Sequence, residues 1–227
     1  MNLINTNEPD CVCLANKLQR LPRKNLKFWF DYITFNSSQT AYCEIYIKYG
    51  SLLSLPDGQT QNIYNGWAAT NVSELISESK YNGYVVNSYN SAMNEILAKF
   101  NSYIDPHVIS KLNFLLTNIK HYLAHGKTPG DIQVAIWKLL HNTVFNNIEH
   151  CHLRVETILK DVHKHGRYFI PSKPTDYVAV FLAAANDWKS TDIILDNQLF
   201  IIPLTFEQFK PTNLPCTLIE WGTYPAS

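Results

Sequence analysis

The sequence lacks an excess of charge of either sign. Its 227 residues include 19 lysines and arginines and 19 aspartates and glutamates, and the basic residues form no cluster. Proteins that bind nucleic acid usually carry a basic patch or stripe that neutralises phosphates. We therefore expect no nucleic-acid partner.

Long apolar runs are also missing. No stretch approaches the roughly 20 apolar residues that a membrane-spanning helix needs, so we expect no membrane span. The first ten residues, Met1–Asp10, contain no apolar core of an export signal. This start is consistent with a cytoplasmic protein or with an exported chain whose signal has been removed.

Cysteines are few and odd in number, namely Cys11, Cys13, Cys43, Cys151 and Cys216. One thiol therefore stays unpaired if the others form disulfides. Cys11 and Cys13 form a CxC pair without the second half that a metal or redox motif would need, so we interpret the pair as structural. In an exported protein, Cys151 and Cys216 would bridge to this pair or to each other.

The composition is that of a folded chain. Hydrophobic residues make up 46% and aromatic residues 13% of the sequence, which is typical of a globular protein and not of a disordered one. We find no internal repeat and no low-complexity segment. We predict a single domain over residues 1–227, with a core of real size.

Strand signals lie at both ends of the chain and helix signals lie in the middle. The predicted strands are Phe28–Phe35, Ala41–Tyr49, Gly83–Val86, Tyr177–Leu182 and Thr217–Trp221, with a hairpin of Asp192–Leu195 and Leu199–Leu204 around Asp196–Gln198. The predicted helices begin near Tyr89, Val108, Thr128 and Ile148, and end before Pro106, at Gly126, near Asn146 and at His163. We predict an α+β fold, in which an antiparallel sheet or sandwich comes from both chain ends (about 25–88 and 167–224) and a helical block (about 89–165) is inserted centrally.

The third of these helices carries a glutamine beside its apolar stripe, where a buried side-chain amide would need hydrogen-bond partners. Thr128, Pro129 and Asp131 form a helix start, with a capping hydroxyl, a proline in the first turn and an acid near the positive end of the helix dipole. Gln133 follows beside the apolar stripe, and an unpaired buried amide costs roughly 1–3 kcal/mol. Two interpretations stay open: a glutamine half in water at the edge of the stripe, or a carboxamide used in chemistry with a cysteine.

The cysteine that could meet this glutamine lies in the second predicted strand. Because side chains alternate along a strand, Ala41, Cys43, Ile45 and Ile47 share one face, which we expect to point inward. The simplest interpretation of Cys43 is a small buried hydrophobic residue.

Several short motifs together resemble the thioester domains of Gram-positive surface adhesins and of related exported proteins. The motifs are Tyr42-Cys43, Phe114-Leu115-Leu116-Thr117-Asn118 and Ile132-Gln133-Val134-Ala135-Ile136-Trp137, followed by Ile170-Pro171, Val178-Ala179-Val180 and Gln198-Leu199-Phe200-Ile201-Ile202-Pro203. The resemblance covers roughly residues 40–205, and its glutamine motif is the most specific part.

This resemblance implies a function. Cys43 and Gln133 would form an internal thioester, a stored acyl electrophile that a lysine amine of a partner protein opens to form an amide. The chain would then be an adhesin-like domain, secreted or at the cell surface, that attaches covalently to a host protein. It would act once, as a binder and not as an enzyme with turnover, and it would need no cofactor.

The histidines suggest a different function. All eight lie between His107 and His165, and His121 and His125 are four residues apart on one predicted helix, a spacing found in helical metal sites. A metal-binding domain of unknown reaction is therefore the main alternative. A cysteine hydrolase that pairs Cys43 with a histidine is a third, although nucleophilic cysteines more often lie at helix N-termini than in mid-strand. A non-catalytic soluble binding domain is the fourth.

Overall fold

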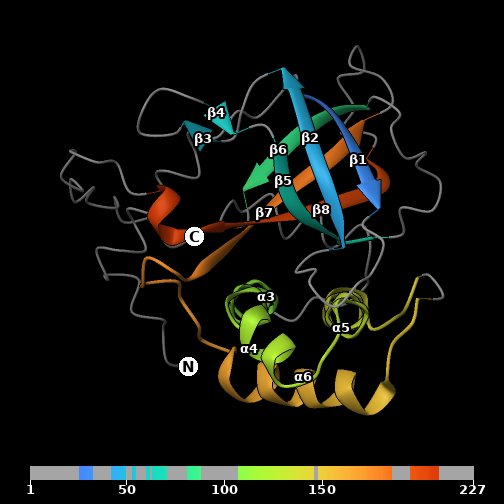
Figure 1. The fold of residues 1–227 in the computed structure, drawn as a ribbon, viewed down its shortest axis with the longest axis vertical. Helices are drawn as coiled ribbons and strands as arrows, with labels where there is room; N and C mark the ends of the chain where they lie inside the picture. Colours follow the sequence, from blue (N-terminus) through green and yellow to red (C-terminus); the bar gives the residue numbers. More distant parts are fainter. Residues whose placement is uncertain are drawn as a thin grey trace, which may run out of the picture.

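Strands from the two ends of the chain pair with each other in the structure, a computed structural model that describes residues 26–32, 42–49, 53–54, 60–61, 63–70, 81–87, 107–145, 148–185 and 195–209. Six of the described strands form a closed antiparallel barrel in the order β1-β2-β5-β8-β7-β6 (Figure 1). They are β1 (Leu26–Tyr32), β2 (Cys43–Tyr49), β5 (Ile63–Ala68), β6 (Tyr81–Asn87), β7 (Tyr177–Ala185) and β8 (Leu195–Thr205). The short strands β3 (Leu53–Ser54) and β4 (Thr60–Gln61) pair separately.

The predicted α+β class is confirmed, with a sheet made from both chain ends and helices inserted between them. The contact between the two ends is the pairing of β5 with β8, where Trp67 lies opposite Ile201. Pairing of β1 with β6 then closes the sheet into a barrel. Closure gives every barrel strand two neighbours, which removes the exposed edges that an open sheet or a sandwich would keep.

The predicted hairpin around Asp196–Gln198 is wrong, because these residues lie inside β8. Strand β7 pairs with β8 on both sides of them: Ala183 lies opposite Leu199, and Ala185 lies opposite Leu195. Two residues along β7 therefore correspond to four residues along β8. The register shift at this point, a β-bulge or irregularity, accommodates the two extra residues in β8. A polar triplet between apolar runs has the same local pattern as a turn.

Four described helices follow the barrel strands of the N-terminal part. They are α3 (Val108–Thr117), α4 (Ile119–Ala124), α5 (Pro129–His141) and α6 (His152–His165). The predicted helix from Val108 to Gly126 is divided at Asn118, whose side-chain amide donates to the Phe114 carbonyl at 2.8 Å. Asparagine competes in this way with the regular helix hydrogen bonds. Gly126 ends α4 with φ of 78°, as expected for a glycine stop.

Helix α5 begins where the sequence predicted and ends earlier. The Thr128 hydroxyl accepts from the Asp131 N–H at 3.2 Å, and the Asp131 carboxylate accepts from the Thr128 N–H at 2.8 Å, which is a reciprocal cap. The helix stops at His141 and not near Asn146, because Asn142 adopts a left-handed conformation with φ of 54°. The predicted helix after Tyr89 and the predicted strand Thr217–Trp221 lie outside the described residues.

The helices form a layer on one side of the barrel, with α6 outermost (Figure 1). Helix α3 packs on β7, and the side-chain Oδ1 of its Asn113 accepts from the Ala179 N–H at 2.8 Å. Helices α5 and α6 pack on each other and are joined at their surface by Lys138 and Glu156, 3.1 Å apart. None of the helices in the described ranges is long and apolar enough to cross a membrane.

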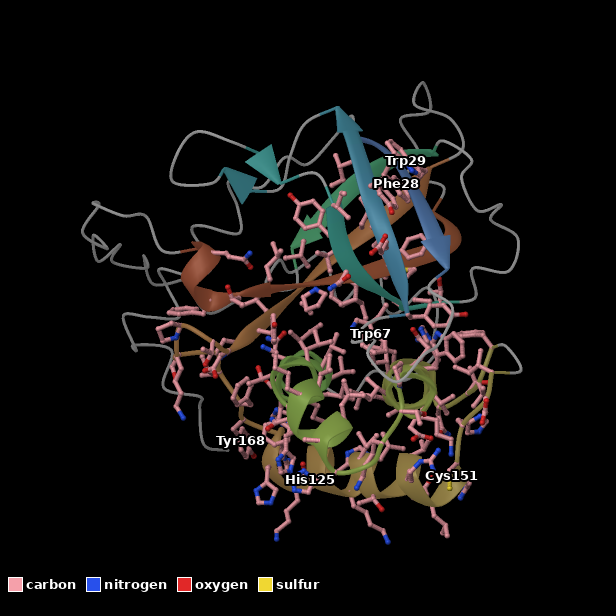
Figure 2. All side chains as sticks on the ribbon, in the orientation of Figure 1. Phe28, Trp29, Trp67, His125, Cys151 and Tyr168 are labelled. Carbon is pink, nitrogen blue, oxygen red and sulfur yellow. The ribbon has the colours of Figure 1, made fainter. Side chains whose placement is uncertain are left out.

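The core runs continuously from the barrel into the helical layer (Figure 2). Phe28 of β1 meets Phe200 of β8 edge to face inside the barrel, with ring centroids 5.9 Å apart. Trp67 of β5 and Trp137 of α5 are both fully buried. The start of α5 packs closely against the backbone that precedes α6. A Cβ added at Gly130 would lie 2.1 Å from the backbone oxygen of Glu149.

We expect Gly130→Ala to lower the free energy of unfolding by about 1–3 kcal/mol, since backbone must move to admit the methyl group. Gly66→Ala is the comparison, because its added Cβ would meet only side-chain atoms, of Ile45 and Cys43, and no backbone. Urea denaturation of both variants measures the difference. A Gly130→Ala loss no greater than that of Gly66→Ala would contradict the close approach at Gly130.

Candidate functional site

Cys43 is the first residue of β2, and its thiol is enclosed. It lies opposite Gly66 of β5, and its Sγ is 3.3 Å from the point where a Cβ of residue 66 would stand. The missing side chain at Gly66 thus leaves room for the thiol. Cys43 is fully buried, which confirms the predicted inward face.

The surroundings of Cys43 favour the neutral thiol. Burial raises the pKa of Cys43 far above its usual value, and the nearby Glu44 carboxylate raises it further. Because the thiolate is the nucleophile, this thiol is protected from chance reaction in the folded protein. A cysteine hydrolase needs the opposite shift, so the environment disfavours that alternative for Cys43.

Gln133 is fully buried, so the interpretation of a glutamine half in water is wrong. Its Oε1 accepts from the Ala68 N–H at 3.0 Å, and its Nε2 donates to the Ala68 carbonyl at 2.7 Å. Both ends of the carboxamide are therefore used on one residue of β5. This pairing offsets the cost of burying an amide.

The position of Gln133 follows from the strand ladder. Backbone groups of successive strand residues point to opposite neighbours. Gly66 accepts from the Tyr42 N–H at 2.9 Å, on the β2 side, and Ala69 donates to the Leu199 carbonyl at 2.7 Å, on the β8 side. The N–H and carbonyl of Ala68 therefore face the β2 side, where the Gln133 carboxamide pairs with them in place of a strand.

The two predicted site residues are thus brought to the same end of the β2–β5 pair. Cys43 lies at Gly66 and Gln133 lies at Ala68, two residues further, which is about 7 Å along a strand. Cys43 forms no disulfide, and both ends of the Gln133 side chain are hydrogen-bonded to Ala68. The site therefore holds a buried thiol from β2 and a buried, hydrogen-bonded carboxamide from α5, two residues apart along β5.

Aromatic side chains connect the glutamine helix with the cysteine strand. Trp137, one turn after Gln133, meets Tyr42 edge to face with ring centroids 6.0 Å apart. The indole N–H of Trp137 is buried, and no hydrogen-bond partner for it lies among the described residues. The Tyr42 contact sets the spacing between α5 and the start of β2.

A histidine that the sequence did not mark as part of this site also reaches the end of β5. His141 Nε2 lies 2.8 Å from the Ala69 carbonyl. Since a carbonyl only accepts, Nε2 carries the proton. Burial lowers the pKa of His141, although the bond to Ala69 acts in the opposite direction. The ring is therefore favoured in its neutral form.

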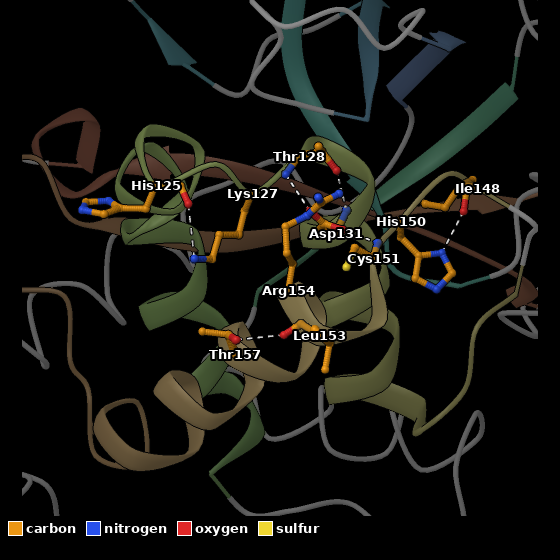
Figure 3. A network of polar contacts seen from close by, with 10 residues as sticks. All are labelled: His125, Lys127, Thr128, Asp131, Ile148, His150, Cys151, Leu153, Arg154 and Thr157. Carbon is orange, nitrogen blue, oxygen red and sulfur yellow. Dashed lines mark hydrogen bonds and ion pairs between the residues drawn. The ribbon is translucent and has the colours of Figure 1, made fainter.

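The start of α5 is fixed by the buried carboxylate of Asp131 (Figure 3). Besides the Thr128 N–H, it accepts from the Cys151 N–H at 2.7 Å and from Arg154 Nε at 2.6 Å. One side chain therefore joins the first turns of α5 and α6. The sequence predicted only the favourable interaction of Asp131 with the dipole of its own helix.

These donors also set the charge of Asp131. Burial alone would raise the pKa of the carboxyl group. The hydrogen bonds from Arg154, Cys151 and Thr128 outweigh burial and hold the pKa below its usual value. The carboxylate therefore stays ionised at neutral pH with its three donors in place.

The histidines do not assemble a larger site within the described ranges. His121 and His125 do lie together, with ring centroids 4.1 Å apart, and His125 Nδ1 contacts the His121 carbonyl at 2.8 Å. No group of three or more His, Cys, Asp or Glu side chains that could hold a metal is found among the described residues. Catalytic zinc sites use three protein ligands and structural sites four, so the metal alternative gains no geometric support.

Cys151 is the one described cysteine among the four for which disulfides were predicted. Cys151 is a free thiol at the start of α6 (Figure 2), and the bridges expected for an exported protein stay a prediction. Its predicted partners Cys11, Cys13 and Cys216 lie outside the described residues.

No family model, curated protein or solved structure matches this sequence. The resemblance to thioester adhesin domains therefore rests on the motifs of the chain itself.

We expect Asp131→Asn to lower the free energy of unfolding by about 2–3 kcal/mol at pH 7, because three donors lose their charged acceptor. A carboxyl whose pKa is lower in the folded state stabilises above its unfolded pKa of about 3.9, and this contribution disappears as the pH falls through the folded value. Urea denaturation from about pH 7 to 3 should show the difference between variant and wild type shrinking below about pH 4. A difference in the free energy of unfolding that does not change with pH would contradict an ionised Asp131 carboxylate.

Proposed function

We propose that this protein forms an internal thioester between Cys43 and Gln133 and uses it to capture a partner amine covalently. The observation that carries the proposal is the placement of a buried thiol at Gly66 and a buried carboxamide at Ala68, about 7 Å apart along β5, at one end of the β2–β5 pair. The adhesin-like motifs around both residues support the same chemistry. Under this proposal the chain is a secreted or cell-surface binding domain.

Formation of the bond is an acyl transfer within the chain. The Cys43 sulfur attacks Cδ of Gln133, the C–N bond of the carboxamide breaks, and the thiol proton leaves with the nitrogen as ammonia. No oxidant or cofactor is needed for this exchange. A neutral, buried thiol must lose its proton as it attacks, so we expect the step to be slow.

Ala68 is placed to assist this step. Its N–H donates to Gln133 Oε1 at 3.0 Å, where negative charge would develop during the attack. A fixed backbone donor at such an oxygen is the main element of an oxyanion hole. The Ala68 carbonyl holds the leaving nitrogen at 2.7 Å and so fixes the plane of the carboxamide.

In the capture of a partner, the Cys43 sulfur would be the leaving group and no longer the nucleophile. A lysine amine of the partner attacks the thioester carbonyl, an amide forms at Gln133, and the Cys43 thiol is restored. Burial of both residues would keep water from the bond until the partner docks. Each domain reacts once, so the process is covalent binding and not enzymatic turnover.

The first test is an intact mass under denaturing, non-reducing conditions. We expect the protein to weigh less than its sequence by one ammonia, because Gln133 loses its nitrogen. Methylamine should add to the carbonyl and appear as a methylamide on the peptide that contains Gln133. Cys43→Ala should show neither change, whereas Cys151→Ala, which removes the other described cysteine, should show both. A measured mass equal to that calculated from the sequence, together with rapid alkylation of Cys43 in the folded protein, would refute the proposal.

The pH dependence supplies a second test. Because burial places the pKa of Cys43 above the physiological range, the reactive thiolate fraction increases with pH. Ammonia loss after refolding should therefore become faster from about pH 6 to 9, in proportion to thiolate. Mass spectrometry of quenched samples measures the rate. A rate that is flat or falls with pH would show that proton removal from Cys43 does not limit the reaction.

A further inference from the structure

The geometry points to a second binding site, separate from Cys43 and Gln133, for a small molecule that carries one carboxylate on a short apolar body. The site is a pocket of about 180 Å³ between the start of α4, β5 and the end of β8. This volume is below the roughly 300–1,000 Å³ of pockets for drug-sized ligands, so the ligand must be small.

The inner wall of the pocket is apolar. Ile119 of α4 and Leu204 of β8 are almost fully buried, and Pro203 of β8 also lines the pocket. The buried ring of Tyr64 completes this wall. Such a surface favours a short hydrocarbon chain or a single ring over a hydrated ion.

The described residues of the rim carry a single charge, and it is positive. Among them Lys120 is the one charged residue, and none is acidic. Lys120 forms no ion pair within the described part of the chain, unlike Lys138, which is paired with Glu156. One ammonium matches one negative charge, whereas phosphate groups are more often held by several cations or by arginine.

The other rim groups supply hydrogen-bond donors. Gln208 Oε1 accepts from the Thr205 N–H at 2.7 Å, which leaves the Nε2 amide of Gln208 as the group that can donate to a ligand. Asn65 and Tyr177 also line the rim, and their side-chain amide and hydroxyl can donate hydrogen bonds. A carboxylate accepts from all of these donors and pairs with Lys120.

The pocket and the thioester site use different parts of β5. Tyr64 and Asn65 line the pocket, whereas Gly66 and Ala68 meet Cys43 and Gln133. Binding in the pocket therefore does not depend on thioester formation, and Cys43→Ala should keep it.

The experiment is a titration of the full chain with benzoate, followed by NMR of the isotopically labelled protein. We expect saturable shifts at residues around the pocket, and at least tenfold weaker binding of benzyl alcohol, which has a similar body without the charge. Lys120→Met should weaken benzoate binding at least tenfold. Lys127→Met is the matched control, because Lys127 lies in the segment between α4 and α5, donates to the His125 carbonyl at 3.3 Å and does not line the pocket.

Three results would overturn the inference. These are the absence of saturable shifts with benzoate, equal binding of benzoate and benzyl alcohol, and equal effects of Lys120→Met and Lys127→Met. Tyr177→Phe gives a second variant that removes only a hydroxyl, and it should weaken benzoate binding while leaving the thermal unfolding temperature of the protein unchanged.

Discussion

The pairing of the Gln133 carboxamide with Ala68 is the interaction on which the arrangement of this protein depends. It lets a side chain of the helical layer complete the strand ladder of the barrel, at the point where β5 turns toward β8. An amide buried this deeply is costly without partners, and so are the N–H and carbonyl of Ala68. Each satisfies the other, which fixes α5 against the barrel in one register.

Everything that positions Gln133 acts through the start of α5. The cap at Thr128 sets the first turn, and the Asp131 carboxylate connects this turn to α6 through Cys151 and Arg154. One turn later, Trp137 contacts the residue that precedes Cys43. The thiol and the carboxamide are therefore held by separate elements, at positions two residues apart along β5.

Local sequence signals predicted the elements better than their connections. The Thr128 cap and the strand with Cys43 were predictable, because capping and alternation are local patterns. Barrel closure was not, since the pairing of β1 with β6 depends on the whole sheet. The continuation of β8 through Asp196–Gln198 depends on its pairing with β7, which no local window contains. The division of α3 from α4 rests on a local contact of Asn118 with Phe114 that the apolar periodicity did not reveal.

The same distinction applies to the site. Cys43 and Gln133 could be selected from the sequence, because their residue types and motifs suggest a shared chemistry. Gly66 and Ala68 could not, since one contributes a missing side chain and the other only its backbone. Asp131 was recognised as a helix-start acid, but its link to α6 depends on residues twenty positions away or more.

Carbon-13 NMR of protein labelled at the glutamine side-chain carbonyls tests the central claim most directly, because it reports the chemical state of Gln133 in the folded protein. The account predicts one carbonyl resonance shifted from the amide range to the thioester range, and the loss of this resonance in Cys43→Ala. Glutamine carbonyls that all stay in the amide range, in both proteins, would contradict it and would leave Gln133 as a structural partner of Ala68 alone.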